Sequence, residues 1–146
     1  MMHLRQATQH DALLLAQLNR QLIIAEGSDN PMDEAQLATR MLGFLAGSYQ
    51  AWLFCVADDV VGYALVDMGR DPVYLRHFMI AESYRRRGYG RQAFGLLYQQ
   101  LGAIPLALDV LHTNPNGLAF WQALGFMPRS INLRMSEKTA RTHERI

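Results

Sequence analysis

A strand, a loop rich in arginine and glycine, and a helix follow one another in the middle of this chain. Residues 74–80 are mostly apolar, helical spacing begins at Phe94, and the loop between them reads Arg85-Arg86-Arg87-Gly88-Tyr89-Gly90-Arg91. Glycines let the backbone turn its N–H groups inward, and a helix start adds unpaired donors and the positive end of the helix dipole. Because one arginine can donate two parallel hydrogen bonds to phosphate oxygens, the segment predicts a pyrophosphate cradle and a phosphorylated cofactor.

The composition indicates one globular domain over residues 1–146, with a core over about 3–135 and a polar tail over 136–146. The formal net charge of +1 gives no global field that would attract nucleic acid or a membrane surface. The single cysteine, Cys55, excludes an internal disulfide, and its apolar surroundings predict a buried, inert thiol. No leader or spanning segment is visible, and the histidines lack metal-ligand spacing. We therefore expect a cytoplasmic protein without a metal site, nucleic-acid partner or membrane partner.

Hydrophobic periodicity and turn signals predict an α/β fold with a mixed sheet. The expected order is β-α-α-β-β-β-α-β-α-β, with strands over 3–7, 49–57, 60–68, 74–80, 106–110 and 126–135. The strand–helix–strand unit over 74–111 has the length of a right-handed crossover, so its two strands should be parallel neighbours. The other strands should be antiparallel, and helices should cover both faces of the sheet.

Several motifs occur in an order that resembles the GNAT superfamily of N-acetyltransferases over residues 3 to about 135. They are the Q/R-x-x-G-x-G/A loop (Arg85, Gly88, Gly90), the strand before it, the hairpin over 56–63, the opening over 4–11, and Asn114 followed by Phe120-Trp121-x-x-Leu124-Gly125-Phe126. The resemblance implies a GNAT-like fold, acetyl-CoA as cofactor, and a primary amine of a small molecule, peptide or protein as acceptor. It also admits a homodimer.

The resemblance implies a cofactor site that spans the strand, the loop and the helix after it. In the family, the strand backbone near Phe78 and Ile80 hydrogen-bonds the pantetheine arm, and a backbone N–H near Ile80 stabilises the developing oxyanion. Asn114 would hold the pantetheine, although an asparagine before a helix is also a common N-cap. The phosphates would lie on the loop residues Arg85, Arg86, Arg87, Gly88, Tyr89, Gly90 and Arg91.

Two residues are candidates for receiving the proton of the acceptor amine. His77 has an ordinary pKa near 6.5 and follows strand alternation, opposite Phe78 and alongside Leu75 and Met79 if the strand has no bulge. It could equally be a structural histidine packed on a neighbouring strand. Glu26 is expected in the loop between the first two helices, which lines the acceptor site in the family, or it is simply a solvated glutamate.

The sequence departs from the family at the residue that often protonates the departing thiolate. A tyrosine is usual seven residues after Asn114, and this chain has Trp121, whose indole N–H is not a useful acid. A thiol with a pKa of about 8.5 is still a tolerable leaving group. Enzymatic transfer and a catalytically silent, acyl-CoA-binding module therefore both stay open.

A dinucleotide site is the remaining alternative for the glycine motif. Residues 88–93 match G-x-G-x-x-A, and Asp109 lies about twenty residues further on. However, seven residues separate Ile80 from Gly88, whereas a dinucleotide fingerprint turns directly off its strand. Asp109 is also expected inside a strand, away from the position that contacts a ribose.

Overall fold

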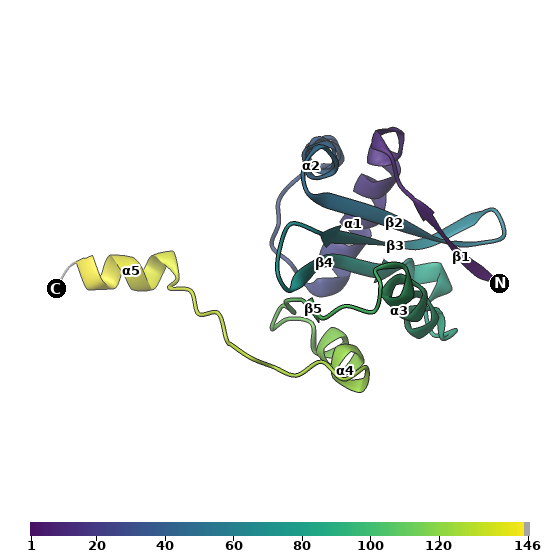
Figure 1. The fold of residues 1–146 in the computed structure, drawn as a ribbon. Coiled ribbons are helices and arrows are strands. Elements are labelled where there is room, and N and C mark those ends of the chain that lie inside the picture. The colour runs from purple at the N-terminus through teal and green to yellow at the C-terminus, as the bar shows by residue number, and fades with distance from the viewer. Residues whose placement is uncertain (145–146) are drawn as a thin grey trace. The chain divides into compact units, whose positions relative to one another are not determined.

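A five-stranded mixed sheet lies at the centre of residues 1–115 (Figure 1). In this computed structural model the strands stand in the order β1 (Met2–Gln6), β2 (Tyr49–Val56), β3 (Asp59–Asp67), β4 (Val73–Ile80) and β5 (Leu106–Ala107). The pairs from β1 to β4 are antiparallel, and β4 pairs with β5 in parallel. The expected hairpin, the crossover and the mixed sheet are therefore confirmed.

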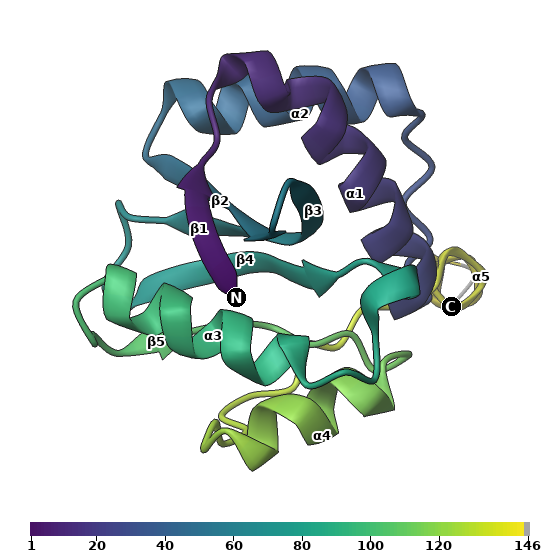
Figure 2. The ribbon, with the colours of Figure 1, turned by 90° about the vertical axis from the view of Figure 1, so that its right-hand side faces the viewer.

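Helices cover both faces of this sheet, as the sequence predicts. Helices α1 (Ala12–Glu26) and α2 (Glu34–Ala46) lie on one face, and α3 (Tyr89–Gln100) lies on the other (Figure 2). The largest core cluster is formed by apolar side chains of α1, α2 and the alternate strand positions that face them, including Leu15, Leu22, Met41, Leu53, Leu65 and Met79. Burial of this apolar surface is the main stabilising term of the fold. Cys55 belongs to the same cluster, so the expectation of a buried thiol is confirmed.

Local capping fixes the start of α2, the start of the short helix before α1, and the end of α1. The Asp33 carboxylate accepts from the Gln36 N–H at 2.8 Å, and the Gln36 side chain accepts from the Asp33 N–H at 2.8 Å. The short helix η1 (Gln9–Asp11) before α1 has the matching capping box between Thr8 and Asp11. Gly27 ends α1 in the left-handed region at φ 69°. Glu26 is thus the last residue of α1, and its expected place in the following loop is wrong.

An irregularity in β4 changes which side chains share a face. Leu65 pairs with His77 and Val66 pairs with Leu75, so Arg76 is an extra residue in β4. Arg76 and His77 both approach the Phe44 ring of α2, with centroid distances of 5.3 Å and 6.4 Å. The condition for alternation, a strand without a bulge, is therefore not met: His77 does not share a face with Leu75, although it does share one with Met79.

Residues 116–146 form a second compact unit, of which the structure describes residues 116–144. Helix α4 (Pro115–Ala123) ends in a Schellman motif, because Phe126 N–H donates to the Trp121 carbonyl and Gly125 adopts φ 99°. Trp121 packs edge-to-face against Phe120 and Phe126, with centroids 4.8 Å and 5.3 Å apart. Helix α5 (Glu137–Glu144) follows Ser136, whose hydroxyl accepts from the Thr139 N–H at 3.1 Å.

Two predicted strands differ from the structure. The strand expected over 126–135 does not form, and the polar tail that follows it contains α5. Ile131 and Leu133 are 86% and 88% exposed, because no strand of the described residues pairs with this stretch and alternation alone gives no burial. The strand expected over 106–110 is limited to β5, so Asp109 lies beyond its end and not within it. None of the helices over residues 1–144 combines the length and apolar character needed to cross a bilayer.

Gly62 allows β3 to approach β4 closely. A Cβ on this residue would overlap the Met79 carbonyl oxygen. Backbone atoms cannot yield as a flexible side chain does, so Gly62→Ala should lower the free energy of unfolding by ~1–3 kcal/mol in urea titrations. Gly43→Ala in α2 is the control, since its Cβ meets nothing within 4 Å and should stabilise by ~0.5–1 kcal/mol. Equal stability of the two variants would contradict this role of Gly62.

Candidate functional site

The arginine–glycine loop lies between the end of β4 and the start of α3. Helix η2 (Glu82–Tyr84) and Arg85–Arg87 separate the two elements, so the chain does not turn directly from strand to helix. Arg85 Nε donates to the Ile80 carbonyl at 2.9 Å, which ties the loop to the last residue of β4. This connection differs from the direct turn of a dinucleotide fingerprint.

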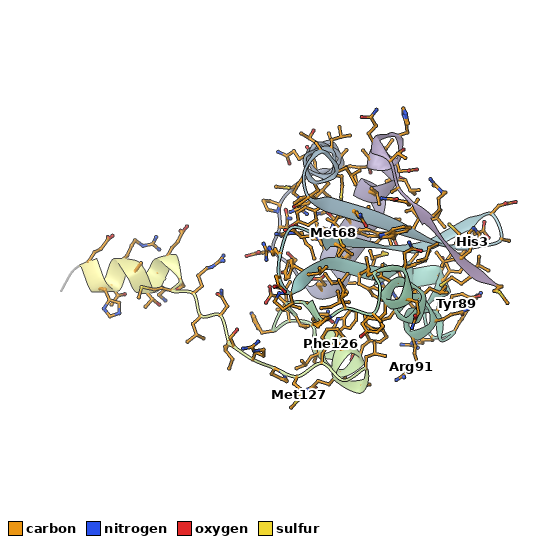
Figure 3. All side chains as sticks on the ribbon, viewed as in Figure 1. His3, Met68, Tyr89, Arg91, Phe126 and Met127 are labelled. Carbon is orange, nitrogen blue, oxygen red and sulfur yellow. The ribbon has the colours of Figure 1, made fainter. Side chains whose placement is uncertain are left out.

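The first turn of α3 is available to a ligand. Its N-cap residue, Gly88, has φ 76° in the left-handed region, and no side chain caps the helix. The first N–H groups of a helix have no intrahelical acceptor and carry the positive end of its dipole. A Cβ at Gly88 would meet nothing within 4 Å, so the space beside the helix start is open. Tyr89 and Arg91 lie on this first turn (Figure 3).

The arginines around this helix start are exposed and uncompensated. Arg85, Arg86, Arg87 and Arg91 are all exposed, and none forms an ion pair within residues 1–144. Arg87 lies over the Tyr84 ring at 5.8 Å, and Arg86 adopts φ 65°. Open backbone, unpaired helix donors and exposed guanidinium groups without ion-pair partners together fit a pyrophosphate group.

The end of β4 borders a hollow of about 410 Å³ lined by Gln21, Ala81, Glu82 and Ser83. The parallel pairing of β4 with β5 is confined to Val73 and Tyr74, because β5 ends at Ala107. Beyond Tyr74, β4 thus runs toward the loop without β5 alongside it. Ala81 N–H already donates to the Val61 carbonyl at 2.7 Å, so it is not the oxyanion donor. The roles expected for the Phe78 and Ile80 backbone stay predictions.

A buried polar network crosses the sheet on the face that α1 and α2 cover. Tyr63 is fully buried, and its hydroxyl lies 3.0 Å from His77 Nδ1. Arg40 Nη2 donates to Asn19 Oδ1 at 2.9 Å, and a hydrogen bond with Asn19 acts on Tyr63. Burial raises the pKa of Tyr63 well above its usual value. The network therefore joins α2, α1, β3 and β4.

Sequence reasoning missed Asn19, Arg40, Tyr63 and Arg76, although two of them carry a visible signal. Asn19 follows Leu15 and precedes Ile23 at a spacing of four residues, so it falls on the apolar face of α1. Arg40 has the same relation to Phe44 in α2. A polar residue on a buried helix face needs a buried partner. The bulge that turns Arg76 toward the same network has no comparable sequence signal.

The environment of His77 overturns the expected pKa near 6.5. Burial and the positive charges of Arg40 and Arg76 lower the pKa of His77 to about 3. His77 is therefore neutral over the range in which it was expected to titrate. Its imidazole also lies edge-on to the Tyr63 ring at 5.9 Å, as a packed structural histidine would.

Glu26 reaches the same network from the end of α1. Its backbone carbonyl accepts from Thr113 Oγ1 at 2.6 Å, which fixes the helix end. Partial burial raises the pKa of the Glu26 carboxyl, and its negative charge in turn raises the pKa of Tyr63. Both proton-acceptor candidates therefore interact with Tyr63: His77 by its 3.0 Å contact with the hydroxyl, and Glu26 through its charge.

Three further residues from the sequence analysis have defined places. Asn114 immediately precedes α4, and its N–H donates to the Leu111 carbonyl at 2.9 Å. Trp121 is buried at 9% exposure, in the aromatic cluster with Phe120 and Phe126. The Asp109 carboxylate accepts from the Tyr74 hydroxyl at 2.6 Å. Asp109, the acid that would contact the ribose in the dinucleotide alternative, is therefore already hydrogen-bonded to Tyr74.

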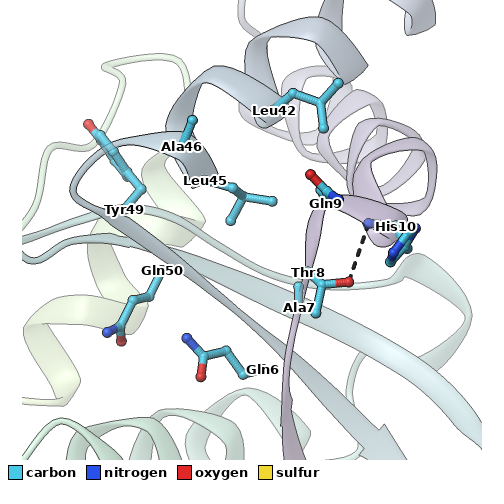
Figure 4. A pocket seen from close by; sticks show the side chains of 10 residues that line it. All are labelled: Gln6, Ala7, Thr8, Gln9, His10, Leu42, Leu45, Ala46, Tyr49 and Gln50. Carbon is cyan, nitrogen blue, oxygen red and sulfur yellow. Dashed lines mark hydrogen bonds between the residues drawn. The ribbon is translucent and has the colours of Figure 1, made fainter.

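A second hollow, of about 710 Å³, lies between β1, the end of α2 and the start of β2 (Figure 4). Its lining combines amide and hydroxyl groups with aliphatic side chains: Gln6, Ala7, Thr8, Gln9, His10, Leu42, Leu45, Ala46, Tyr49 and Gln50. Within it, Thr8 Oγ1 accepts from the His10 N–H at 3.3 Å. No residue expected to hold the cofactor lines this hollow.

Comparison with known proteins identifies the family. The model of the acetyltransferase (GNAT) family matches residues 15–126, so the chain belongs to the GNAT acetyltransferases. A comparison with curated proteins gives no match.

Solved structures support the same assignment. An acetyltransferase from Thermus thermophilus is 28% identical, with 87% of each chain covered and a TM-score of 0.72. A predicted acetyltransferase from Clostridium acetobutylicum, solved with acetyl-CoA, is 16% identical over 93% of this chain and 96% of that one, with a TM-score of 0.70. PaiA N-acetyltransferase from Thermoplasma acidophilum, solved with coenzyme A, is 12% identical over 90% and 93%, with a TM-score of 0.69. The last two show the shared fold.

The lowered pKa of His77 predicts a specific dependence of stability on pH. The unfolded chain binds a proton at this residue below its ordinary pKa of ~6.5, and the folded chain binds it only near a pKa of about 3. Stability should therefore be lost as the pH falls through this window, by at most ~1.4 kcal/mol per pH unit. His77→Gln should flatten the slope between about pH 6.5 and about pH 4 in urea titrations. Exposed His10 is the control, and His10→Gln should keep the wild-type slope; an unchanged slope in His77→Gln would refute the assignment.

Proposed function

We propose that this chain is an acetyl-CoA-dependent N-acetyltransferase, in which a primary amine of a small molecule, peptide or protein attacks the thioester directly. An N–C bond forms, the C–S bond breaks, the amine loses a proton, and coenzyme A leaves as the thiolate. The observation that carries the proposal is the uncapped start of α3 beside Gly88, surrounded by unpaired arginines. Family membership supports the class of reaction.

The cofactor is acetyl-CoA, which supplies an acetyl group activated as a thioester when bound. Gly88, Tyr89, Gly90 and Arg91 would hold its pyrophosphate with the unpaired N–H groups of α3. Arg85, Arg86 and Arg87 would add side-chain charge, and Arg85 keeps the loop fixed to β4 through Ile80. The Phe78 and Ile80 backbone and Asn114 would contact the pantetheine arm.

The acceptor amine must lose a proton, and Glu26 is the better placed of the two candidates. A carboxyl with a raised pKa holds a proton more readily than an ordinary one, whereas an imidazole with a pKa of about 3 holds it poorly. His77 then orients Tyr63 through the 3.0 Å contact at Nδ1. The thiolate leaves without an acid from Trp121.

The proposal includes a single GNAT domain over residues 1–146 and a cytoplasmic location. The buried thiol of Cys55 suits a reducing compartment. A homodimer, which the family resemblance admits, would appear as a doubled mass in light scattering.

A substitution at the start of α3 tests the cofactor site. Gly88→Val should abolish the rise in melting temperature caused by acetyl-CoA, because a branched Cβ opposes φ 76° and fills the open space beside the helix. Gly95→Ala, also in α3 with nothing within 4 Å of its Cβ, should keep the rise. In wild type, acetyl-CoA at a hundredfold excess over Kd should add ~2.7 kcal/mol, and NAD at the same concentration should add none. If a folded Gly88→Val variant still binds acetyl-CoA, the pyrophosphate site is not at the start of α3.

Release of free thiol in the presence of an amine panel tests the reaction and the proton acceptor. Glu26→Gln should lower kcat/KM by ~10²–10⁴-fold and leave the thermal shift with acetyl-CoA unchanged. The variant His77→Gln is measured in the same assay. If kcat/KM falls in His77→Gln and not in Glu26→Gln, His77 is the proton acceptor. Thiol release no faster with any amine than with water would favour the silent acyl-CoA-binding module.

A further inference from the structure

Arg40 and Arg76 form a positively charged pair that no acidic side chain of residues 1–144 neutralises. Both lie against the Phe44 ring, with guanidinium carbons 5.6 Å and 5.3 Å from its centroid. Burial and the charge of Arg76 lower the pKa of Arg40, and burial with the charges of both arginines lowers the pKa of His77. Neither arginine forms an ion pair within the same residues.

Most donors of these two arginines have no acceptor in the part of the chain that the structure describes. Arg40 Nη2 donates to Asn19, whereas its Nε is buried without a hydrogen-bond partner. Arg76 Nε donates to the Tyr49 hydroxyl at 2.6 Å. Each guanidinium carries five N–H donors, and a buried donor left unpaired costs about 1–3 kcal/mol. Of these donors only Arg40 Nε is buried without a partner among residues 1–144, so the other unpaired guanidinium N–H groups are accessible to water or to an acceptor group from outside the protein.

The nearby carboxylates are already engaged with other partners. Asp67 pairs with Arg70 at 3.2 Å and accepts from Ser48 at 2.6 Å. Asp109 accepts from the Tyr74 hydroxyl. Glu26 acts on the network through Tyr63 and is not paired with Arg40. No carboxylate of residues 1–144 therefore pairs with either arginine, and both are available to an anionic group of a ligand.

The position of the pair in the fold indicates which ligand supplies the anion. Arg76 directly precedes His77 in β4, four residues before Ile80, which spans about 13 Å of extended strand. The pyrophosphate cradle lies beyond Ile80, after η2, so the cofactor phosphates are assigned to a separate set of arginines. Arg40 and Arg76 instead adjoin the Glu26–Tyr63–His77 surroundings to which the acceptor amine is assigned.

We propose that Arg40 and Arg76 bind a carboxylate of the acceptor, so that the preferred substrate is a small amine bearing a carboxylate, such as an amino acid. The inference rests on the proposed N-acetyltransferase function. Guanidinium groups match the planar carboxylate with two parallel hydrogen bonds, and partial burial strengthens these charge-assisted contacts. The rings of Phe44, Tyr49 and Tyr74, all within 5.5 Å of the Arg76 guanidinium, hold its plane in place.

Matched pairs of amines, measured by thiol release from acetyl-CoA, test this inference. Each pair consists of an amino acid and the amine that lacks its carboxylate. The set includes α-, β- and γ-amino acids, so that the preferred distance between amine and carboxylate can be determined. In wild type, kcat/KM should favour at least one acid over its partner by ~10–100-fold. Two further comparisons test other anionic groups. Dipeptides with free and with amidated C-termini test a peptide carboxylate, and phosphoethanolamine against ethanolamine tests a phosphate.

The variants Arg76→Gln and Arg40→Gln should each reduce that preference at least tenfold, mainly through KM for the acid, while acetyl-CoA still raises the melting temperature. Arg76→Lys should retain part of it, since lysine keeps the charge and loses the two-pronged geometry. Arg70→Gln is the matched control: Arg70 lies 4.3 Å from the Tyr74 ring but pairs with Asp67, and its removal should leave the preference intact.

Equal kcat/KM for acids and their partners in wild type would overturn the carboxylate inference and leave the acetyltransferase function standing. A preference for phosphoethanolamine or for free peptide C-termini over all amino acids would likewise overturn it. Release of thiol with none of the amines would overturn the proposed function, and the inference with it. If Arg76→Gln does not fold, Arg40→Gln and the wild-type ratio decide the question.

Discussion

The antiparallel pairing of β3 with β4 is the interaction on which the rest of this structure depends. Gly62 lets the β3 backbone lie against Met79 and Ile80, where any Cβ would collide with a carbonyl oxygen. That pairing fixes the end of β4, from which Arg85 anchors the arginine–glycine loop through the Ile80 carbonyl. It also sets Tyr63 of β3 beside His77 of β4. The arginine–glycine loop proposed to hold the cofactor and the Tyr63–His77 surroundings proposed for the acceptor are thus attached to one strand pair.

The single extra residue in β4, Arg76, changes which side chains of the strand face α2. Because Arg76 is inserted between the pairs of Leu75 and His77, two successive polar side chains face α2. An unbroken strand would have sent Arg76 to the opposite face. Burial, together with the charges of Arg40 and Arg76, keeps His77 neutral, and the two guanidinium groups have no acidic partner among residues 1–144. The irregularity therefore adds a second positive charge beside His77 and contributes to the anion-binding character proposed for the acceptor site.

Two classes of arginine emerge, distinguished by their surroundings. The loop arginines 85–87 and 91 are exposed at the start of a helix, where solvent screens them until a polyanion binds. Arg40 and Arg76 are partly buried against aromatic rings, where a lower effective dielectric strengthens each interaction. A pyrophosphate suits the first environment and a single carboxylate suits the second. The two environments therefore fit the two different anions that we propose for them.

The sequence by itself determined the element order to Gln100, the capping boxes, the hairpin and the loop before α3, because caps, turns and periodicity act over a few neighbouring residues. It also placed Arg85 to Arg91 at one helix start. Only the tertiary structure decided the rest. The alternation over 126–135 formed no strand, since strand pairing depends on distant partners, and the pKa of His77 depends on Arg40, 37 residues away in the chain. The meeting of Asn19, Arg40, Tyr63 and Arg76 is long-range packing, which no local pattern records.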